Sequence, residues 1–90
     1  MKINPSLISF VGRSKRRQEI LQKLQERSMS QPEIKKLTGM YKTHTSRTLT
    51  ELSEKKLITC VNPQDKAFKF YKITLLGKKA IAEVQRILKE

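Results

Sequence analysis

Residues 39–56 read GMYKTHTSRTLTELSEKK, and this stretch decides how the rest of the chain is interpreted. Leu49 and Leu52, followed by Leu57, keep the spacing of one helical face, and Thr45 lies four residues before Leu49 on that face. The opposite side carries cationic and hydroxyl-bearing side chains, namely Lys42, Thr43, His44, Ser46, Arg47 and Thr50. No acidic residue precedes Glu51 in the stretch. We therefore predict the second helix of a helix-turn-helix, the one that enters a DNA major groove.

Arg47 is the first candidate for contact with a base edge, since a guanidinium can bind guanine O6 and N7 through two hydrogen bonds. Two alternatives stay open: Arg47 holds a phosphate, or it pairs internally with Glu51, one turn further along. The hydroxyls of Thr43, Ser46 and Thr50 are predicted to contact bases or phosphates, with a solvated helix face as the alternative.

The residues before this stretch carry the signature of a short helix. Ser30 can cap its start, Pro32 is tolerated in the first turn, and Glu33 at the third position completes a capping box. Ile34 and Leu37 are predicted to point inward. Gly39 is predicted to end the helix in a left-handed conformation. A short helix, a glycine-containing turn and an amphipathic helix together predict a helix-turn-helix over residues 31–55.

The N-terminal part is predicted to contain two further helical segments. Residues 1–12 hold Pro5 and a short apolar cluster, which predicts a brief helix that packs on the domain or on a second subunit. Ser14 is predicted to cap a helix that reaches about Glu26. Arg16 and Arg17 in its first turn are candidates for phosphate contact, with a solvated basic helix start as the alternative.

After Leu57 the period changes to that of strands, and residues 57–73 are predicted to form a β-hairpin, or wing, around a turn at residues 62–65. Lys66 and Lys69 are predicted to meet phosphate or the minor groove, with a solvated loop as the alternative. Three aromatic residues, Phe68, Phe70 and Tyr71, could stack on bases, but strand alternation predicts that some of them belong to the core. Thr74 is predicted to cap a last helix over residues 75–89, whose wide apolar stripe predicts a dimer interface.

The composition narrows the classes of function. The chain has 90 residues, which predicts one domain, and its 20 Lys and Arg against 8 acidic residues give a formal charge of +12. Such a charge favours duplex DNA, RNA or an anionic membrane surface. The chain has a single cysteine, Cys60, which excludes an internal disulfide and predicts a cytoplasmic, nucleoid-associated protein. Cys60 itself is predicted to be a small buried apolar residue.

Other classes find little support in the sequence. No apolar run approaches the ~20 residues of a membrane span. His44 is the only histidine and has no cysteine or carboxylate companions at metal-ligand spacing. No Ser or Cys has a supporting His, and no glycine-rich phosphate loop is present. We therefore predict no enzyme, no metal, no cofactor and no small-molecule ligand.

The order of these elements resembles the winged helix-turn-helix of MarR- and ArsR-type transcriptional regulators, especially small archaeal members. Three stretches carry the resemblance: FVGRSKRRQEILQKL (residues 10–24), THTSRTLTELSEKKLIT (43–59) and FYKITLLGKKAI (70–81). Two departures matter. The family usually opens its recognition helix on Ser or Thr, where this chain has Tyr41, so the helix start could shift to Thr43 or Tyr41 could reach the DNA backbone. Metal-sensing ArsR members carry cysteines in that helix, whereas this chain has none, which excludes a thiolate metal sensor.

The prediction is a mainly helical α+β fold, a winged helix-turn-helix with a two-stranded wing and a C-terminal dimerisation helix. The resemblance implies a homodimer that binds double-stranded DNA sequence-specifically and regulates transcription. Alternatives are a sequence-independent DNA or chromatin binder, a winged helix used for protein contact, and, more weakly, an RNA binder. The predicted DNA-binding residues are Arg16, Arg17, Tyr41, Lys42, Thr43, His44, Ser46, Arg47, Thr50, Lys66 and Lys69.

Overall fold

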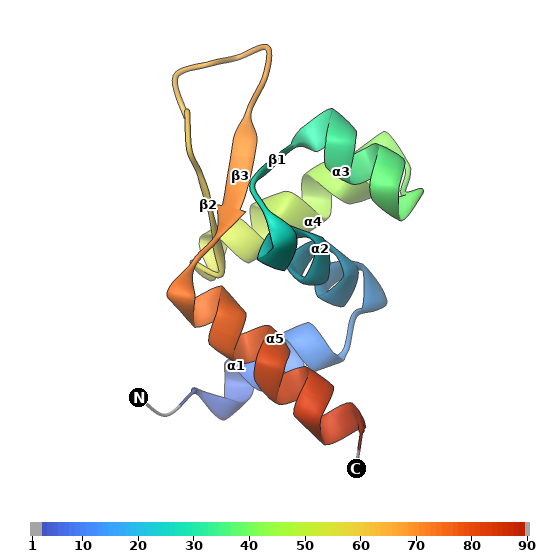
Figure 1. Cartoon of the computed structure of the whole chain (residues 1–90), viewed down its shortest axis with the longest axis vertical. Helices are drawn as coiled ribbons and strands as arrows, with labels where there is room; N and C mark the ends of the chain where they lie inside the picture. The colour runs from blue at the N-terminus through green and yellow to red at the C-terminus, as the bar shows by residue number, and fades with distance from the viewer. Residues whose placement is uncertain (1–2, 90) are drawn as a thin grey trace.

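The computed structural model describes residues 3–89, and within them the chain forms five helices and one small sheet. In chain order these are α1 (Pro5–Gly12), α2 (Lys15–Glu26), β1 (Met29–Ser30), α3 (Gln31–Thr38), α4 (Lys42–Glu54), β2 (Ile58–Cys60), β3 (Phe70–Ile73) and α5 (Leu75–Leu88). Helices α1 and α5 lie together at one end of the molecule, while α3 and the loop between β2 and β3 lie at the other (Figure 1).

Side-chain caps fix where most of these helices begin. Ser14 accepts a hydrogen bond from Arg17 N, Ser30 from Glu33 N, and Thr74 from Gly77 N, as the sequence predicted. Each cap satisfies a backbone donor that would otherwise lack a partner in the first turn. Gly39 ends α3 with φ +72°, which confirms the predicted left-handed glycine. Helix α4 differs, because its N-cap Tyr41 makes no side-chain cap hydrogen bond.

The sheet has three antiparallel strands in the order β1-β3-β2, one more than the predicted two-stranded wing. Strand β3 pairs on one side with β2, with Ile58 opposite Ile73, and on the other with β1, with Ser30 opposite Phe70. Strand β1 escaped prediction because two residues are too few to show a period. Its pairing brings the start of α3 beside the wing.

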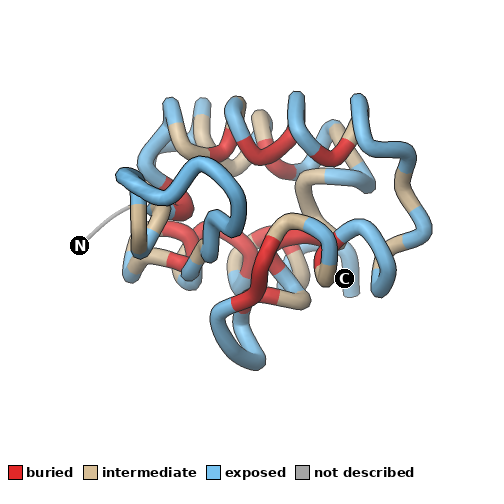
Figure 2. Tube along the Cα trace, turned by 90° about the horizontal axis from the view of Figure 1, so that it is seen from above, coloured by how far each residue is buried: buried red, intermediate tan, exposed pale blue. Residues whose placement is uncertain are grey.

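The core contains Leu49, Leu52 and Leu57, which the helical spacing predicted, together with apolar residues of α2 and α5, namely Ile20, Leu21, Leu24, Ala80, Ile81 and Val84. Figure 2 shows that buried residues lie on the inward side of the helices while the outer turns are exposed. No helix among the described residues is long and apolar enough to cross a membrane.

The prediction that Leu37 points inward is wrong. Its side chain is 47% exposed, whereas Ile34 on the same helix is fully buried. Helix α3 has only eight residues and lies at the edge of the domain, so it buries a narrow face centred on Ile34. Thr38, one turn after Ile34, is half-buried and donates its hydroxyl to Ile34 O at 2.7 Å. Leu37 therefore lies on the flank of the buried face.

Candidate nucleic-acid interface

The two faces of α4 divide as the sequence predicted. On the inner face, Thr45, Leu49 and Leu52 are at most 1% exposed, and Thr48 is 4% exposed. Lys42, Thr43, Ser46, Arg47 and Thr50 are exposed on the opposite side, and His44 is half-buried. Thr48 was not predicted to be buried, although it lies four residues before Leu52, and the same spacing from Leu49 placed Thr45 on this face. It is tolerated inside because its hydroxyl donates to His44 O at 2.7 Å.

The structure decides where α4 begins, which is one of the two alternatives left open for Tyr41. The helix begins at Lys42, so its start is not shifted to Thr43. The carbonyl of Tyr41 accepts hydrogen bonds from the backbone N–H of Thr45 at 2.9 Å and from its hydroxyl at 3.0 Å. The Tyr41 ring is 76% exposed and meets the His44 ring edge-on, with 6.0 Å between centroids. Tyr41 thus extends the outer face of α4 beyond its first turn.

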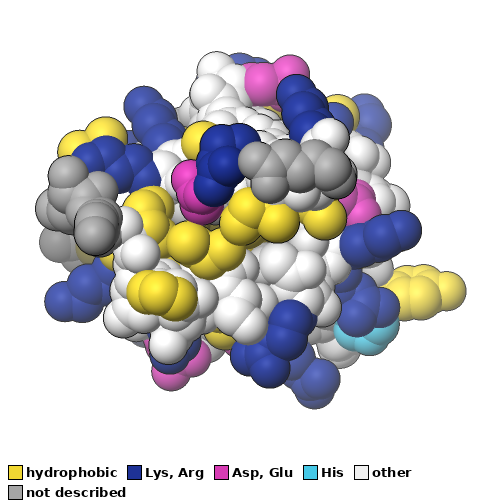
Figure 3. Space-filling view, turned by 90° about the horizontal axis from the view of Figure 1, so that it is seen from below, with side chains coloured by type: hydrophobic (Ala, Val, Ile, Leu, Met, Phe, Trp, Pro, Cys, Tyr) yellow, Lys and Arg dark blue, Asp and Glu magenta, His cyan; other side chains and the backbone are white. Residues whose placement is uncertain are grey.

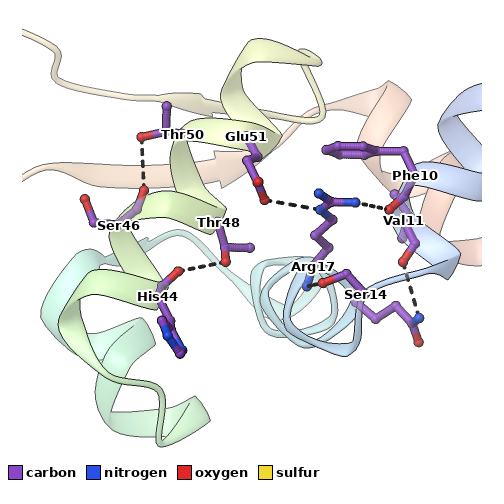
Figure 4. A network of polar contacts seen from close by, with 10 residues as sticks. Phe10, Val11, Ser14, Arg17, His44, Ser46, Thr48, Thr50 and Glu51 are labelled. Carbon is purple, nitrogen blue, oxygen red and sulfur yellow. Dashed lines mark hydrogen bonds and ion pairs between the residues drawn. The ribbon is translucent and has the colours of Figure 1, made fainter.

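Hydrogen bonds within α4 restrict what the exposed hydroxyls can recognise. Thr50 donates its hydroxyl proton to Ser46 O at 3.0 Å (Figure 4). In this arrangement the Thr50 oxygen can only accept, and phosphate oxygens are acceptors too. Thr50 is therefore better suited to the amino group of a base than to the DNA backbone.

Arg47 does not form the internal ion pair that the sequence left open. The Oε1 atom of Glu51 lies 3.3 Å from Nε of Arg17 instead (Figure 4). Among residues 3–89 the Arg47 side chain makes no hydrogen bond or ion pair, and it is exposed. A free guanidinium therefore stands on the outer face of α4.

Arg17 itself faces the interior of the protein. Its Nη1 donates to Phe10 O at 2.6 Å, and its guanidinium carbon lies 3.7 Å from the centroid of the Phe10 ring. The side chain is 18% exposed. These contacts join α1, α2 and α4, so Arg17, which the sequence offered for phosphate contact, is occupied in holding these helices together. Its neighbour Arg16 is exposed.

Arg17→Ala is expected to lower the free energy of unfolding by about 2 kcal/mol, because it removes charge-assisted hydrogen bonds and leaves a half-buried Glu51 without its cation. Arg16→Ala, which removes the same charge from the next residue, is expected to change it by less than about 0.5 kcal/mol. Urea denaturation of both variants measures the difference. Equal losses would contradict the structural role assigned to Arg17.

The wing loop, residues 61–69, is held in shape by hydrogen bonds from two side chains, Asn62 and Asp65, and the sequence did not predict these bonds. Asn62 Nδ2 donates to Phe68 O at 2.6 Å, and Asn62 Oδ1 accepts from Phe70 N at 2.8 Å. Asp65 Oδ1 accepts from the backbone N–H of Phe68 at 2.9 Å and of Ala67 at 2.8 Å, and these bonds lower the pKa of Asp65. The only acidic residue of the loop therefore shapes the turn.

The aromatic residues of the hairpin separate as strand alternation predicted. Tyr71 is half-buried against the core, and burial, followed by the nearby Cys60, raises its pKa. Phe68 and Phe70 are 57% and 42% exposed. Cys60, predicted to be buried, is half-buried, with its Sγ 3.8 Å from Asn62 Oδ1.

A groove of about 470 Å³ runs between the wing and the starts of α3 and α4. Its lining residues are Gln31, Pro32, Lys35, Lys42, Lys66, Ala67 and Lys69. Three of its four lysines, Lys42, Lys66 and Lys69, are among the residues that the sequence predicted to contact DNA. Lys35 was not, because only the pairing of β1 with β3 places α3 beside the wing. Within residues 3–89 no group of three or more His, Cys, Asp and Glu side chains could hold a metal ion.

Comparison with known proteins places this geometry in context. The family model described as "HVO_A0261 N-terminal domain" matches residues 5–90. No curated protein matches the sequence.

Solved structures share the fold at low sequence identity. MarR of E. coli, crystallised as a variant with operator DNA, gives a TM-score of 0.73 at 19% identity over 90% of this chain and 59% of MarR. A MepR variant of S. aureus bound to an oligodeoxyribonucleotide gives 0.72 at 26% identity over 84% of this chain and 58% of MepR. A fragment of a "possible transcriptional regulatory protein" from Mycobacterium bovis gives 0.76 at 24% identity over 94% and 90% of the two chains.

This chain thus spans less than two thirds of the MarR and MepR chains. The fold is the winged helix-turn-helix of MarR-type transcriptional regulators, as the resemblance in the sequence predicted.

Proposed function

This chain belongs to the HVO_A0261 N-terminal domain family, and we propose that it regulates transcription by binding duplex DNA sequence-specifically as a homodimer. In this proposal each α4 enters a major groove and each wing meets the flanking backbone or minor groove. The two half-sites would lie about one helical turn, roughly 34–36 Å, or a multiple of it apart.

The observation that carries the proposal is the outer face of α4. Arg47 is exposed and free to contact a base, because Arg17 occupies the acidic partner that could have held it. Ser46 and Thr50 lie on the same face, Thr50 as a hydrogen-bond acceptor and Ser46 with its hydroxyl exposed. Guanidinium and hydroxyl groups on a helix with no acidic residue before Glu51 suit the donor and acceptor pattern of base edges.

Two further observations support DNA as the ligand. MarR and MepR, which share this fold, were crystallised with operator DNA and with an oligodeoxyribonucleotide respectively. The formal charge of +12 also favours binding to phosphate-rich duplex, so we expect affinity to fall steeply as salt increases.

The face formed by α1 and α5 supports the dimer. Leu75, Ile87 and Leu88 on α5 are 66%, 45% and 65% exposed, and Leu7 and Ile8 on α1 are half-buried. Figure 3, seen from the α1 and α5 end, shows hydrophobic side chains crossing the middle of this face with Lys and Arg around them. A second copy covering this face would remove the apolar surface from water. A monomeric mass in sedimentation equilibrium would contradict the dimer.

Arg47→Ala is expected to remove sequence discrimination worth about 1–3 kcal/mol, because the base-edge contact is lost while phosphate contacts stay. Lys66→Ala, its control, is expected to weaken binding to all duplexes about equally. The test first selects duplexes from a random pool at physiological salt. It then compares the Kd of each variant for the selected duplex and for a scrambled one.

The outcomes separate the proposal from its alternatives. Equal losses on selected and scrambled duplex after Arg47→Ala would contradict base readout. A random duplex that competes as well as any selected one would indicate a sequence-independent DNA binder. Duplex binding only at low salt would indicate a winged helix used for contact with an acidic protein.

A further inference from the structure

We propose that the groove between the wing and the helix-turn-helix is a phosphate-binding site that takes one phosphodiester strand between two lysine-bearing walls. Lys66 and Lys69 on the wing form one wall, and Lys35 on α3 and Lys42 on α4 form the other. The inference deepens the proposed function and rests on it for DNA as the natural source of the strand. It adds Lys35 and Gln31 to the binding surface and assigns the lysines of the wing and of the helices to one ligand.

The two walls are connected by the backbone. Gln31 N, at the start of α3, donates to Lys69 O at 3.3 Å, and the neighbouring pair Ser30 and Phe70 stand opposite each other in the β1-β3 ladder. Figure 1 shows α3 and the wing at the same end of the molecule, joined through β1 and β3. The spacing between the walls is therefore set by hydrogen-bonded backbone, so the groove is formed before a ligand arrives.

The charge in the groove is uncompensated by protein groups. No lining residue is acidic, and among the described residues none of the four lysines forms an ion pair. The acidic residues that adjoin lining residues in the sequence have other partners. Glu33 pairs with Arg27, and Asp65 accepts from the backbone of Ala67 and Phe68. Four like charges around one groove repel each other, and a bound polyanion would remove that repulsion.

The chemistry of the walls selects the ligand class. Lysine ammonium groups bind phosphate as point charges, and contacts to phosphate carry no sequence information, so a strand held in the groove by its phosphates is recognised by its backbone. Gln31 adds a neutral amide donor. The same chemistry would accept a soluble polyphosphate chain. We therefore expect inorganic tripolyphosphate to occupy the groove without DNA, and the experiment separates the two sources.

The test compares two double variants that remove the same charge from the same elements. Lys35→Gln with Lys69→Gln alters the groove. Lys36→Gln with Lys72→Gln alters exposed lysines on the same helix and on the same hairpin that do not line it. With duplex DNA, a homodimer of the groove variant loses four groove lysines, so the slope of log K against log salt is expected to become shallower by roughly 3.6, since each lost phosphate contact removes roughly 0.9. Between 50 and 200 mM salt this is roughly a hundredfold smaller loss of affinity.

The second arm uses tripolyphosphate and no DNA. Titration followed by amide NMR is expected to shift the signals of Gln31, Lys35 and Ala67 in the parent protein and in the Lys36/Lys72 variant. Those shifts are expected to be lost in the Lys35/Lys69 variant. Equal responses of the two double variants in both arms would overturn the groove site, because charge alone would then explain binding.

The two proposals can fail separately. If a selected duplex binds tightly but the groove variant behaves like its control in both arms, the groove site is overturned and the proposed function stands. If no duplex is bound at physiological salt but tripolyphosphate shifts the groove signals and the groove variant abolishes them, the proposed function fails. The phosphate site then stands on its own.

Discussion

Gly77→Ala is expected to lower the free energy of unfolding by about 3 kcal/mol, because a Cβ atom at this position has no space. It would lie 2.1 Å from the carbonyl oxygen of Leu57 and 2.7 Å from Cγ1 of Ile73. The carbonyl cannot move easily, since it accepts hydrogen bonds from the N–H and the hydroxyl of Thr74, each at 3.0 Å. The overlap outweighs the helix propensity of about 1 kcal/mol that alanine gains over glycine.

The matched control is Gly12→Ala, at the last residue of α1, where nothing lies within 4 Å of the added Cβ. This change is expected to be neutral or to stabilise by up to about 1 kcal/mol. Thermal denaturation measures both, and a loss of 3 kcal/mol corresponds to a fall in Tm of roughly 12–24 °C for a domain of this size. A Gly77→Ala protein as stable as its parent would mean that α5 does not approach the chain at Leu57 this closely.

Ile34→Ala is expected to cost about 3 kcal/mol of stability, whereas Leu37→Ala on the same helix is expected to cost less than about 1 kcal/mol. Ile34 is fully buried, so truncation leaves a cavity, while Leu37 is 47% exposed and already partly in water. Chemical denaturation of the two variants compares nearly the same change in apolar volume within one eight-residue helix.

If Ile34→Ala does not fold, its cost already exceeds the one expected at Leu37, and Ile34→Val, expected to cost about 1 kcal/mol for a single methylene, measures the burial of position 34. Equal costs at positions 34 and 37 would restore the inward orientation that the sequence predicted for Leu37. A larger cost at Leu37 would mean that α3 is rotated about its axis relative to this structure. Either result would also change which side chains of α3 face the wing, Lys35 among them.

Local signals in the sequence were sufficient for most of the fold. The caps Ser14, Ser30 and Thr74 fall where their hydroxyls meet backbone donors, and Gly39 adopts the left-handed conformation that ends α3. These features depend on residues within one helical turn, so they can be read along the chain. The inner face of α4 was predictable for a similar reason, because burial follows the helical period.

Features that depend on distant partners were not predictable. Strand β1 exists because β3 pairs with it, some 40 residues further along the chain. Arg17 was a candidate for phosphate contact until packing brought Phe10 and Glu51 to its guanidinium. The sequence offered Glu51 to Arg47 because the two are one turn apart. In the folded protein Glu51 pairs with Arg17 instead, because the packing of α2 against α4 brings the Arg17 guanidinium to this carboxylate.

Residues 39–56 show the difference between what the sequence predicts and what it does not. By itself the sequence determined that the stretch is an amphipathic helix with Leu49 and Leu52 inside and Arg47 outside, because a helix repeats every 3.6 residues wherever it is placed. Only the tertiary structure decided that Arg47 is free and that Lys42 shares a groove with Lys35 and the wing. Those facts depend on how α2, α3 and β2 pack around α4 and on the pairing of β1 with β3. Contacts between segments far apart in the chain leave no local period to read.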